Sequence, residues 1–344
     1  MSDQPAVKGL DIEQLECKLE LVYNWGYEQA RADLRQLYTK AKHNQWIPEE
    51  TLPWDTDVDP EKRNGPEELF PLAGSDIYRK MDKRQQQKLN AEVGAWVLSQ
   101  FLHGEQGALL ATAQLVTAVP HYNAKLYAAT QVVDEARHVE VYDRYLHEKI
   151  GFSYPINQHL KVLLDLILKD TRWDMKFLGM QIMVEGLALS SFAMIQQTST
   201  EPLLKELTRY VLLDEARHVA FGVLSLRDYY DDMPEVERKE REDFVYEAAR
   251  LMRDRFLFQE VWEKAGLPVK ECMDITLHNE GQKMFRTLLF SKIVPAIKKI
   301  GLLTPTLRER FQELGILQYE NWSDPIEDLV NSEQFRRTAA SPAA

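Results

Sequence analysis

The sequence Asp-Glu-Ala-Arg-His-Val occupies residues 134–139 and occurs again, unchanged, at residues 214–219. A lone glutamate stands 30 residues before the glutamate of each copy, namely Glu105 for the first and Glu185 for the second. The two copies of this unit are offset by 80 residues throughout. The chain therefore repeats one arrangement, a glutamate followed by a Glu-x-x-His motif, and this repeat predicts both the fold and the chemistry.

Helix geometry brings the residues of this repeat together. Residues three apart lie on one helix face with Cβ atoms about 5–6 Å apart, so the Glu and His of one motif can bind the same ion. The 30-residue spacing spans half a helix, a tight turn and half of an antiparallel partner, which returns the lone glutamate to the level of the motif. Two such hairpins packed face to face predict six metal ligands: Glu105, Glu135, His138, Glu185, Glu215 and His218.

The negative charge of the four carboxylates indicates that such a cluster binds cations. Four carboxylates inside a helical bundle are too costly to keep ionised unless cations neutralise them. Two divalent ions add four positive charges, which takes the formal net charge of the chain from −12 to −8. Di-iron and di-manganese carboxylate bundles have this ligand arrangement, and carboxylate and imidazole ligands suit iron, with manganese as a competitor. The sequence therefore predicts two iron ions, or manganese and iron.

The aspartate and arginine of each repeat are predicted to support the ligands: Asp134, Arg137, Asp214 and Arg217. A metal-bound imidazole usually donates its second N–H group to a carboxylate. Each aspartate precedes a ligand glutamate and so points about 100° away from it, toward a neighbouring helix. With a pseudo-twofold axis the expected pairing is crosswise, Asp214 with His138 and Asp134 with His218. The arginines then either brace the aspartates or form ion pairs on the exterior.

Tyr142 follows His138 by four residues, which places it within reach of the metal ions. It can be oxidised to a radical or can donate a hydrogen bond to a ligand carboxylate, and we favour the hydrogen bond. The helix faces that carry Glu105 and Glu185 are otherwise apolar, which favours an apolar substrate. These faces predict a substrate pocket, although each side chain can equally pack the core: Phe101, Ala108, Leu109, Thr112, Leu178, Ile182, Ala188, Leu189 and Phe192.

The rest of the sequence predicts an all-α protein, because apolar residues recur at spacings of three and four without an alternating β pattern. We expect helices over 12–45, 78–118, 122–150, 156–169, 172–198, 201–230, 234–265, 280–300 and 304–315. Residues 47–74 contain five prolines and predict an extended crossing loop.

No linker divides the chain, so we expect one helical domain over residues 1–344. Its predicted parts are an N-terminal helix and crossing loop (1–77), a metal-binding core bundle (78–230), C-terminal helices (231–330) and a frayed tail (331–344).

Composition excludes several classes of protein. Hydrophobic residues make up 44% and charged residues 28% of the chain, which is ordinary globular usage. The net charge of −12 argues against a nucleic-acid partner, and no uncharged apolar run reaches the roughly 18 residues of a membrane span. The two cysteines, Cys17 and Cys272, exclude a disulfide framework. We therefore expect an acidic cytoplasmic protein without a membrane or nucleic-acid partner.

These motifs resemble those of the ferritin-like dimetal-carboxylate oxidases and oxygenases, most strongly over residues 98–225. The doubled Asp-Glu-x-Arg-His is similar to that of bacterial multicomponent monooxygenases, which carry a threonine where Leu189 stands here. In the small subunit of class I ribonucleotide reductase, Tyr142 would occupy the place of the radical tyrosine, and Trp46–Glu50 resembles an entry segment. Two departures weigh against that role: Glu105 replaces the usual aspartate, and the last two dozen residues contain no tyrosine.

Two further subfamilies resemble the chain in part. Ligand-binding oxidases related to the reductase subunit form a Val–Tyr cross-link that needs a tyrosine five residues before the third glutamate, where Met180 stands here. Aminobenzoate N-oxygenases place an extra histidine ligand four residues before the last Glu-x-x-His, where Val211 stands here. The resemblance therefore implies the superfamily and leaves the subfamily open.

The resemblance implies an O2-dependent oxidoreductase that hydroxylates or otherwise oxidises a small, largely apolar organic substrate. We expect electrons from an external ferredoxin or reductase, and we expect a homodimer. Two alternatives are a radical-generating subunit of the ribonucleotide reductase type and a ligand-binding heterodinuclear oxidase. Iron handling, as in ferritin, is less favoured because ferritin subunits are far shorter than 344 residues.

Overall fold

The computed structural model describes residues 12–27 and 31–322. These residues form helices joined by loops, with no β-strand among them, so the predicted all-α class is confirmed. The expected tail at 331–344, and the end of the C-terminal region predicted to reach residue 330, lie outside the described residues.

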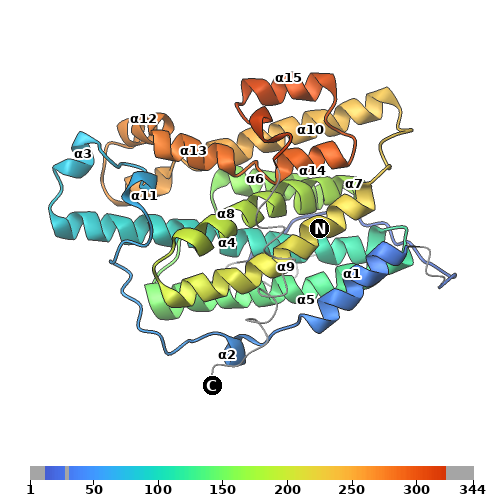
Figure 1. Ribbon diagram of the computed structural model, residues 1–344, viewed down its shortest axis with the longest axis horizontal. Helices are drawn as coiled ribbons and strands as arrows, with labels where there is room; N and C mark the ends of the chain where they lie inside the picture. The colour runs from blue at the N-terminus through green and yellow to red at the C-terminus, as the bar shows by residue number, and fades with distance from the viewer. Residues whose placement is uncertain (1–11, 28–30, 323–344) are drawn as a thin grey trace.

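Two antiparallel hairpins form a four-helix bundle (Figure 1). The first joins α4 (Lys83–Ala118) to α5 (Tyr122–Tyr145), and the second joins α8 (Glu185–Thr198) to α9 (Pro202–Leu226). Helix α5 also packs against α9, so that the two hairpins face each other. This packing brings the middles of α4, α5 and α9 and the start of α8 around one axis, where the repeated motifs lie.

Helix α4 begins at a capping box. The Asp82 side chain accepts a hydrogen bond from the Gln85 N–H at 2.8 Å, and the Gln85 side chain accepts one from the Asp82 N–H at 2.9 Å. The helix therefore starts at Lys83 instead of the predicted residue 78, and a separate turn, α3 (Asp76–Arg79), precedes it.

The helix that carries Glu185 is wound differently along its length. It runs from α7 (Trp173–Phe177) through a π-helical stretch, η3 (Leu178–Val184), into α8. The combined span, Trp173–Thr198, is long and apolar enough to cross a membrane, but 78% of its most apolar window is buried in the fold. It is therefore the central core helix of the bundle.

The remaining elements before the C-terminal region surround the bundle. Helix α1 packs on α5 and α9, and α6 packs on α4. Gly151, with φ of +87°, ends the π-helical turn that extends α5. These elements are α1 (Ala32–His43), α2 (Pro48–Thr51), η1 (Glu67–Leu69), η2 (Leu146–Ile150) and α6 (Gln158–Lys169).

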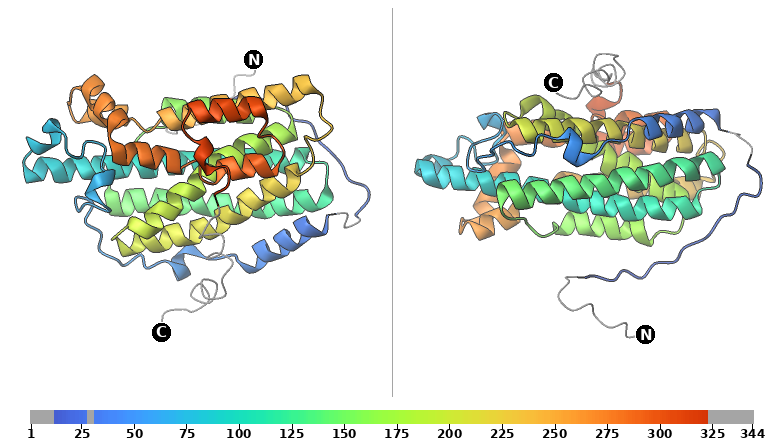
Figure 2. Two further views of the ribbon diagram at one scale, coloured as in Figure 1. Left: turned by 45° about the horizontal axis from the view of Figure 1, so that its top comes forward. Right: turned by 90° about the horizontal axis from the view of Figure 1, so that it is seen from below.

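The C-terminal helices cover the side of the bundle opposite α1 (Figure 2). Helix α10 packs on α6 and on η3, and α14 also contacts η3. The elements are α10 (Glu235–Asp254), α11 (Gln259–Lys264), α12 (Val269–His278), α13 (Glu280–Leu288), α14 (Ile293–Lys299), α15 (Pro305–Glu313) and η4 (Leu317–Tyr319).

The predicted helix over 12–45 is wrong for its first half. Residues 12–27 form no helix, and only Ala32–His43 are helical. The Val22 N–H donates to the Thr117 carbonyl at 2.9 Å, and the Asn24 side chain donates to the Pro120 carbonyl at 2.7 Å. Contacts with the end of α4 thus replace the intrahelical hydrogen bonds that the sequence pattern favours.

Two other predicted helices are interrupted and one helix was missed. The range 234–265 breaks between α10 and α11, where Phe258 adopts a left-handed φ of +56°. The range 280–300 breaks between α13 and α14. Helix α12 was not predicted, although Pro268 precedes it directly. At the first break the side chains of Phe258 and Trp262 are buried in the core, so tertiary packing overrides the local periodicity there. The crossing loop predicted over 47–74 also contains two short helical turns, α2 and η1.

Candidate metal centre

The four helices of the bundle each bring one glutamate to the same level of the axis. Glu105 comes from α4 and Glu135 from α5, while Glu185 is the first residue of α8 and Glu215 comes from α9. None of the four is more than 5% exposed. The structure therefore brings together in the interior the four carboxylates that the repeat singles out.

These side chains divide into two overlapping groups. Glu105, Glu135, His138 and Glu215 each offer a ligand atom within 4.8 Å of the others. A second group with the same property contains Glu135 together with two further residues, Glu185 and His218. Because Glu135 belongs to both groups, the geometry suits two adjacent cations with a shared carboxylate.

Both imidazoles turn Nδ1 toward the carboxylates. His138 Nδ1 lies 3.2 Å from carboxylate oxygens of both Glu105 and Glu215. His218 Nδ1 lies 3.1 Å from an oxygen of Glu135. The two ring centroids are 5.8 Å apart, so the imidazoles occupy opposite ends of one compact cluster.

The other imidazole nitrogen of each histidine meets the aspartate of the opposite repeat. His138 Nε2 lies 3.1 Å from Asp214 Oδ2, and His218 Nε2 lies 3.3 Å from Asp134 Oδ2. The expected crosswise contacts are thus present. Since an imidazole that binds metal through Nδ1 carries its proton on Nε2, each aspartate is placed to accept that proton's hydrogen bond.

The two arginines of the repeat lie inside and connect the two aspartates. Arg137 donates to Asp134 and, at 2.9 Å, to Asp214. Arg217 donates to Asp214 and, at 3.4 Å, to Asp134. Both arginines are less than 9% exposed, so they brace the aspartates and do not form exterior ion pairs. Two arginines and two aspartates thus tie α5 to α9.

Three further residues contact this network and were not predicted. The Gln131 side chain donates to Glu135 at 2.9 Å and to Glu185 at 2.8 Å. Its position four residues before Glu135 was a usable signal, because that spacing shares a helix face. Gln45 donates to Asp134 and the Trp46 indole donates to Asp214, each at 2.8 Å. Nothing in the local sequence links those two residues to the cluster.

The pKa values of the clustered side chains show that their charges are unfavourable when no cation is bound. Burial, and then the charge of Glu215, raises the pKa of Glu105 to about 8. Burial also raises the pKa of Glu185 well above its ordinary value. Burial opposes a charge on His138, but hydrogen bonds to Asp214 and Glu105 raise its pKa well above the ordinary value. In the metal-free cluster, bound protons thus reduce the net negative charge that cations would otherwise neutralise.

The cluster also contains buried polar atoms that no described group satisfies. Neither carboxylate oxygen of Glu215 makes a hydrogen bond of regular geometry, and the same holds for one oxygen each of Glu135 and Glu185 and for the Nδ1 atom of His218. Buried polar atoms are nearly always paired in folded proteins. Carboxylate oxygens and an imidazole nitrogen that lie close together without regular hydrogen bonds fit divalent cations, so the residues present suit a two-metal centre.

Tyr142 lies beside this cluster in an aromatic layer. Its ring centroid is 5.9 Å from that of Phe101 and 5.8 Å from that of Phe192. Burial, and then the charge of Glu105, raises the pKa of Tyr142 well above its ordinary value. Thr208 is a polar neighbour of the hydroxyl, but no hydrogen bond of regular geometry satisfies it. The tyrosine is therefore neutral, with a proton available to a nearby acceptor.

A small cavity of about 20 Å³ borders three of the glutamates, between α4, α6, α8 and the end of α10. That volume is enough for about one water molecule. Three of the nine predicted pocket residues line it: Phe101, Ala108 and Ala188. The other six are not among its lining residues: Leu109, Thr112, Leu178, Ile182, Leu189 and Phe192. Arg255 also lines this cavity and was not predicted.

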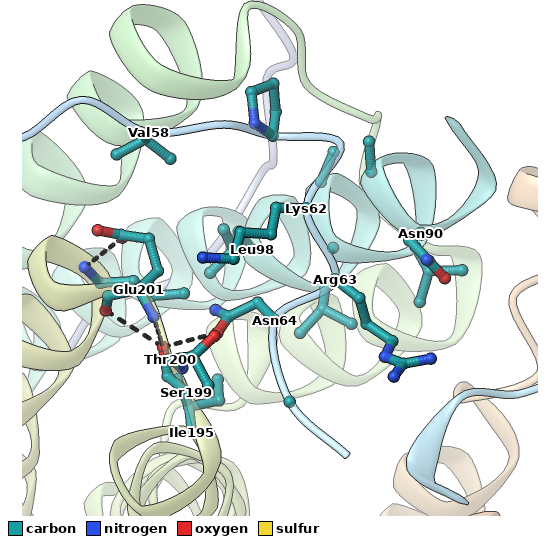
Figure 3. Close-up of a pocket in the computed structure, with 18 of the residues that line it drawn as sticks. Val58, Lys62, Arg63, Asn64, Asn90, Leu98, Ile195, Ser199, Thr200 and Glu201 are labelled. Carbon is teal, nitrogen blue, oxygen red and sulfur yellow. Dashed lines mark hydrogen bonds between the residues drawn. The ribbon is translucent and has the colours of Figure 1, made fainter. Parts of the chain in front are cut away.

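A larger cavity of about 370 Å³ opens at one end of the bundle, where the crossing loop passes the turn between α8 and α9 (Figure 3). Asn64 fastens the loop there, because its side-chain oxygen accepts hydrogen bonds from the Ser199 hydroxyl at 2.9 Å and from the Thr200 N–H at 2.7 Å. Lys62 and Arg63 of the same loop lie at the cavity, opposite apolar residues of α4.

The aromatic layer lies between the two cavities. Leu98 lines the large cavity and precedes Glu105 by seven residues on α4, which is about 10 Å at 1.5 Å per residue. Phe101 lies between them, one helical turn from each, and packs on Phe192 with ring centroids 4.8 Å apart. Along α4, Phe101 therefore lies between the large cavity and Glu105.

Comparison with known proteins is consistent with this geometry. Residues 28–301 match the family model of p-aminobenzoate N-oxygenase AurF. An R2-like ligand-binding oxidase variant, reconstituted anaerobically with a Mn/Fe cofactor, has 16% sequence identity and a TM-score of 0.53, covering 82% of this chain and 99% of its own. Another variant, reconstituted aerobically, has the same identity and TM-score, covering 81% and 99%. These solved structures confirm the predicted ferritin-like fold. No curated protein matches the sequence.

The ligand assignment predicts how metal content responds to substitution. His218→Ala should reduce bound metal from two ions per chain toward one, because His218 belongs to only one of the two ligand groups. Helicity should change little, since apolar burial holds the bundle together. His278→Ala is the matched control, because that histidine is exposed and remote in sequence from the repeat. Metal analysis after Fe(II) loading decides the matter, and two retained ions in His218→Ala would refute the assignment.

Metal uptake should also release protons. With a pKa of about 8, Glu105 is mostly protonated at neutral pH in the metal-free protein, and an incoming ion must displace that proton. Apparent affinity for a divalent ion should therefore rise with pH up to about 8, while the metal-free fold loses stability as pH rises over the same range. Calorimetry in buffers of different protonation enthalpy measures the release, and pH-independent binding would contradict the prediction.

Proposed function

The chain belongs to the p-aminobenzoate N-oxygenase AurF family, and from this premise we propose that it uses O2 to oxidise a small, largely apolar organic molecule. As a member of this family it is an enzyme of the non-haem dimetal oxidase class. The observation that carries the proposal is the convergence of four buried carboxylates and two imidazoles on one point of the bundle axis.

The donor set supports a specific division of the ligands. Glu105 and His138 would hold one ion, Glu185 and His218 would hold the other, and the glutamates of the two motifs lie between them. When bound, two iron ions, or manganese with iron, supply the electrons that reduce O2. The mixed carboxylate and imidazole donors fit either metal pair.

The protein's own contribution is positioning and the exclusion of water. The Asp–Arg network fixes both imidazoles through their Nε2 atoms, so Nδ1 of each points inward. Gln131 holds one oxygen each of Glu135 and Glu185 by hydrogen bonds. Because these ligands are at most 5% exposed, bulk water is kept from the reacting atoms, which limits side reactions.

We propose that Tyr142 donates a hydrogen bond to a ligand carboxylate in the loaded enzyme. Its hydroxyl is buried, protonated and close enough to Glu105 and Glu215 that their charges raise its pKa. A hydrogen-bonding role uses only the groups that lie beside the ring.

The route for an organic substrate is proposed to start in the 370 Å³ cavity at the bundle end. That size is typical of small-molecule pockets, whereas the 20 Å³ cavity beside the glutamates is too small for an organic molecule. Rotation of Phe101 and Phe192 would connect the two spaces. Of the predicted wall residues, Phe101, Ala108 and Ala188 would then face the reacting end of the substrate, and the other six would pack the core.

A second candidate is a ligand-binding heterodinuclear oxidase, in which the end cavity would hold the bound ligand. The two candidates differ in the metal they select and in the fate of the organic molecule. Equal Mn and Fe content after loading with both metals, with a ligand that co-purifies unchanged, would favour the second candidate. Preferential iron content with turnover of an added organic molecule would favour the first.

Partners beyond the substrate remain predictions. We propose an external ferredoxin or reductase as electron donor, because two cysteines cannot supply the four thiolates that an iron–sulfur cluster usually needs. A homodimer and a cytoplasmic location are likewise proposed from the sequence.

Oxygen consumption tests the proposed function. Protein loaded anaerobically with Fe(II) should consume O2 faster than the same Fe(II) in buffer when air is admitted, because the cluster holds two reduced ions together. His218→Ala should fall to the rate of free Fe(II), while His278→Ala should match the unaltered protein. An oxygen electrode measures both. No acceleration by fully loaded protein would refute an O2-activating role.

The role of Tyr142 gives a separate test. Tyr142→Phe should change the rate of O2 consumption by no more than about tenfold, since one hydrogen bond contributes on the order of 1 kcal/mol. Tyr145→Phe is the matched control, because Tyr145 lies on the same helix and donates to Glu201 instead. Rapid-freeze electron paramagnetic resonance completes the test. A long-lived tyrosyl signal lost only in Tyr142→Phe would overturn the hydrogen-bonding role.

A further inference from the structure

Arg255 is a buried cation beside the carboxylate cluster. It follows the last residue of α10, where the chain turns before α11, and its side chain is 6% exposed. It lines the small cavity together with three of the four clustered glutamates: Glu105, Glu185 and Glu215. Arg255 thus reaches the ligand side of the bundle from a helix that contributes nothing else to the cluster.

The guanidinium of Arg255 has no hydrogen-bond acceptor among the described residues. Its Nε atom is buried without a hydrogen-bond partner, and its guanidinium carbon lies 4.6 Å from the centroid of the Phe256 ring. The other buried arginines of the described chain all donate to an oxygen: Arg137, Arg209, Arg217, Arg241 and Arg286. Arg255 therefore differs from them in lacking an acceptor.

The charges of the loaded centre leave Arg255 without a counterion. Two divalent ions balance the four clustered glutamates, and the two arginines of the repeats balance the two aspartates with which they pair. Burial lowers the pKa of Arg255 to about 10, so it is still charged at neutral pH. Leaving an isolated charge in the interior is expensive, and an anion entering the cavity would relieve that penalty.

We propose that Arg255 binds a carboxylate in the small cavity, next to the metal ligands. A guanidinium offers two parallel N–H donors that match the two oxygens of a carboxylate. The present cavity of about 20 Å³ admits only the tip of such a group. Gly104 borders it, and a Cβ atom added there would meet nothing within 4 Å, so there is free space beside the tip.

Two sources can supply this carboxylate, either a small free anion such as acetate or the carboxylate end of the organic substrate. The proposal rests on the proposed function in one respect, because the charge count assumes two divalent ions in the cluster. Its test therefore uses metal-free protein as well as protein loaded with Mn(II). Loss of metal binding alone would refute the proposed function and leave the Arg255 site still testable.

Calorimetric titration with sodium acetate and with sodium benzoate tests the site at constant ionic strength. The unaltered protein should bind at least one of the two, both with and without Mn(II). Arg255→Met should weaken that binding by about tenfold or more, and Arg255→Lys should fall between them, because it keeps the charge without the paired donors. Acetate binding alone would identify a free small anion, and benzoate binding would identify the end of a larger molecule.

Thermal unfolding separates ligand binding from a structural role. Arg255→Met should leave the Tm of the anion-free protein unchanged or raise it, since it removes an unpaired buried charge. Arg286→Met is the matched control, because Arg286 is equally buried but donates to the carbonyls of Thr276 and Leu277. That variant should lose stability and keep anion binding. Unchanged anion binding by Arg255→Met, or a drop in its Tm like that of Arg286→Met, would overturn the proposal.

Discussion

The burial of four carboxylates on the axis of one helical bundle is the constraint on which the rest of this structure depends. Like charges in an interior of low dielectric repel strongly and lose their hydration. Without cations the cluster holds protons, as the pKa of about 8 for Glu105 shows, and it leaves both oxygens of Glu215 unpaired. The apolar packing of the surrounding helices must therefore hold a core that is unfavourable until metal binds, and metal binding becomes part of folding stability.

A second consequence of this buried cluster is that its imidazole rings must be held in one orientation. An imidazole can rotate, and a metal site needs a fixed nitrogen, so each histidine is held at its far nitrogen by an aspartate from the opposite hairpin. These aspartates are themselves buried and need donors, which the two repeat arginines, Gln45 and Trp46 supply. The network thus extends from the metal ligands to Gln45 and Trp46, just before the crossing loop, and ties three distant stretches of chain to the same point.

The sequence separation of the interacting residues decides which parts of the fold and the site could be predicted. The clustering of Glu135 with His138 is a matter of helix periodicity, and the 30-residue spacing of the lone glutamates is a matter of hairpin length, so both were predictable. Gln45 and Arg255 reach the site from segments whose docking depends on tertiary packing, and no local pattern marks them. The same limit explains why residues 12–27 were wrongly expected to be helical.

Membership of this family makes the apolar residue Val211 informative about the metal ligands. The resemblance to aminobenzoate N-oxygenases implies an additional histidine ligand at the position where Val211 stands here. This valine is fully buried, in the same apolar cluster as Tyr142. A valine offers no donor atom, so the proposed centre would be held by six protein ligands. Arg255, a cation without a counterion, borders the carboxylate cluster at the small cavity. Because this unpaired guanidinium lines the same small cavity as three of the proposed ligand glutamates, an anionic group at the end of a ligand that enters this cavity would be favoured.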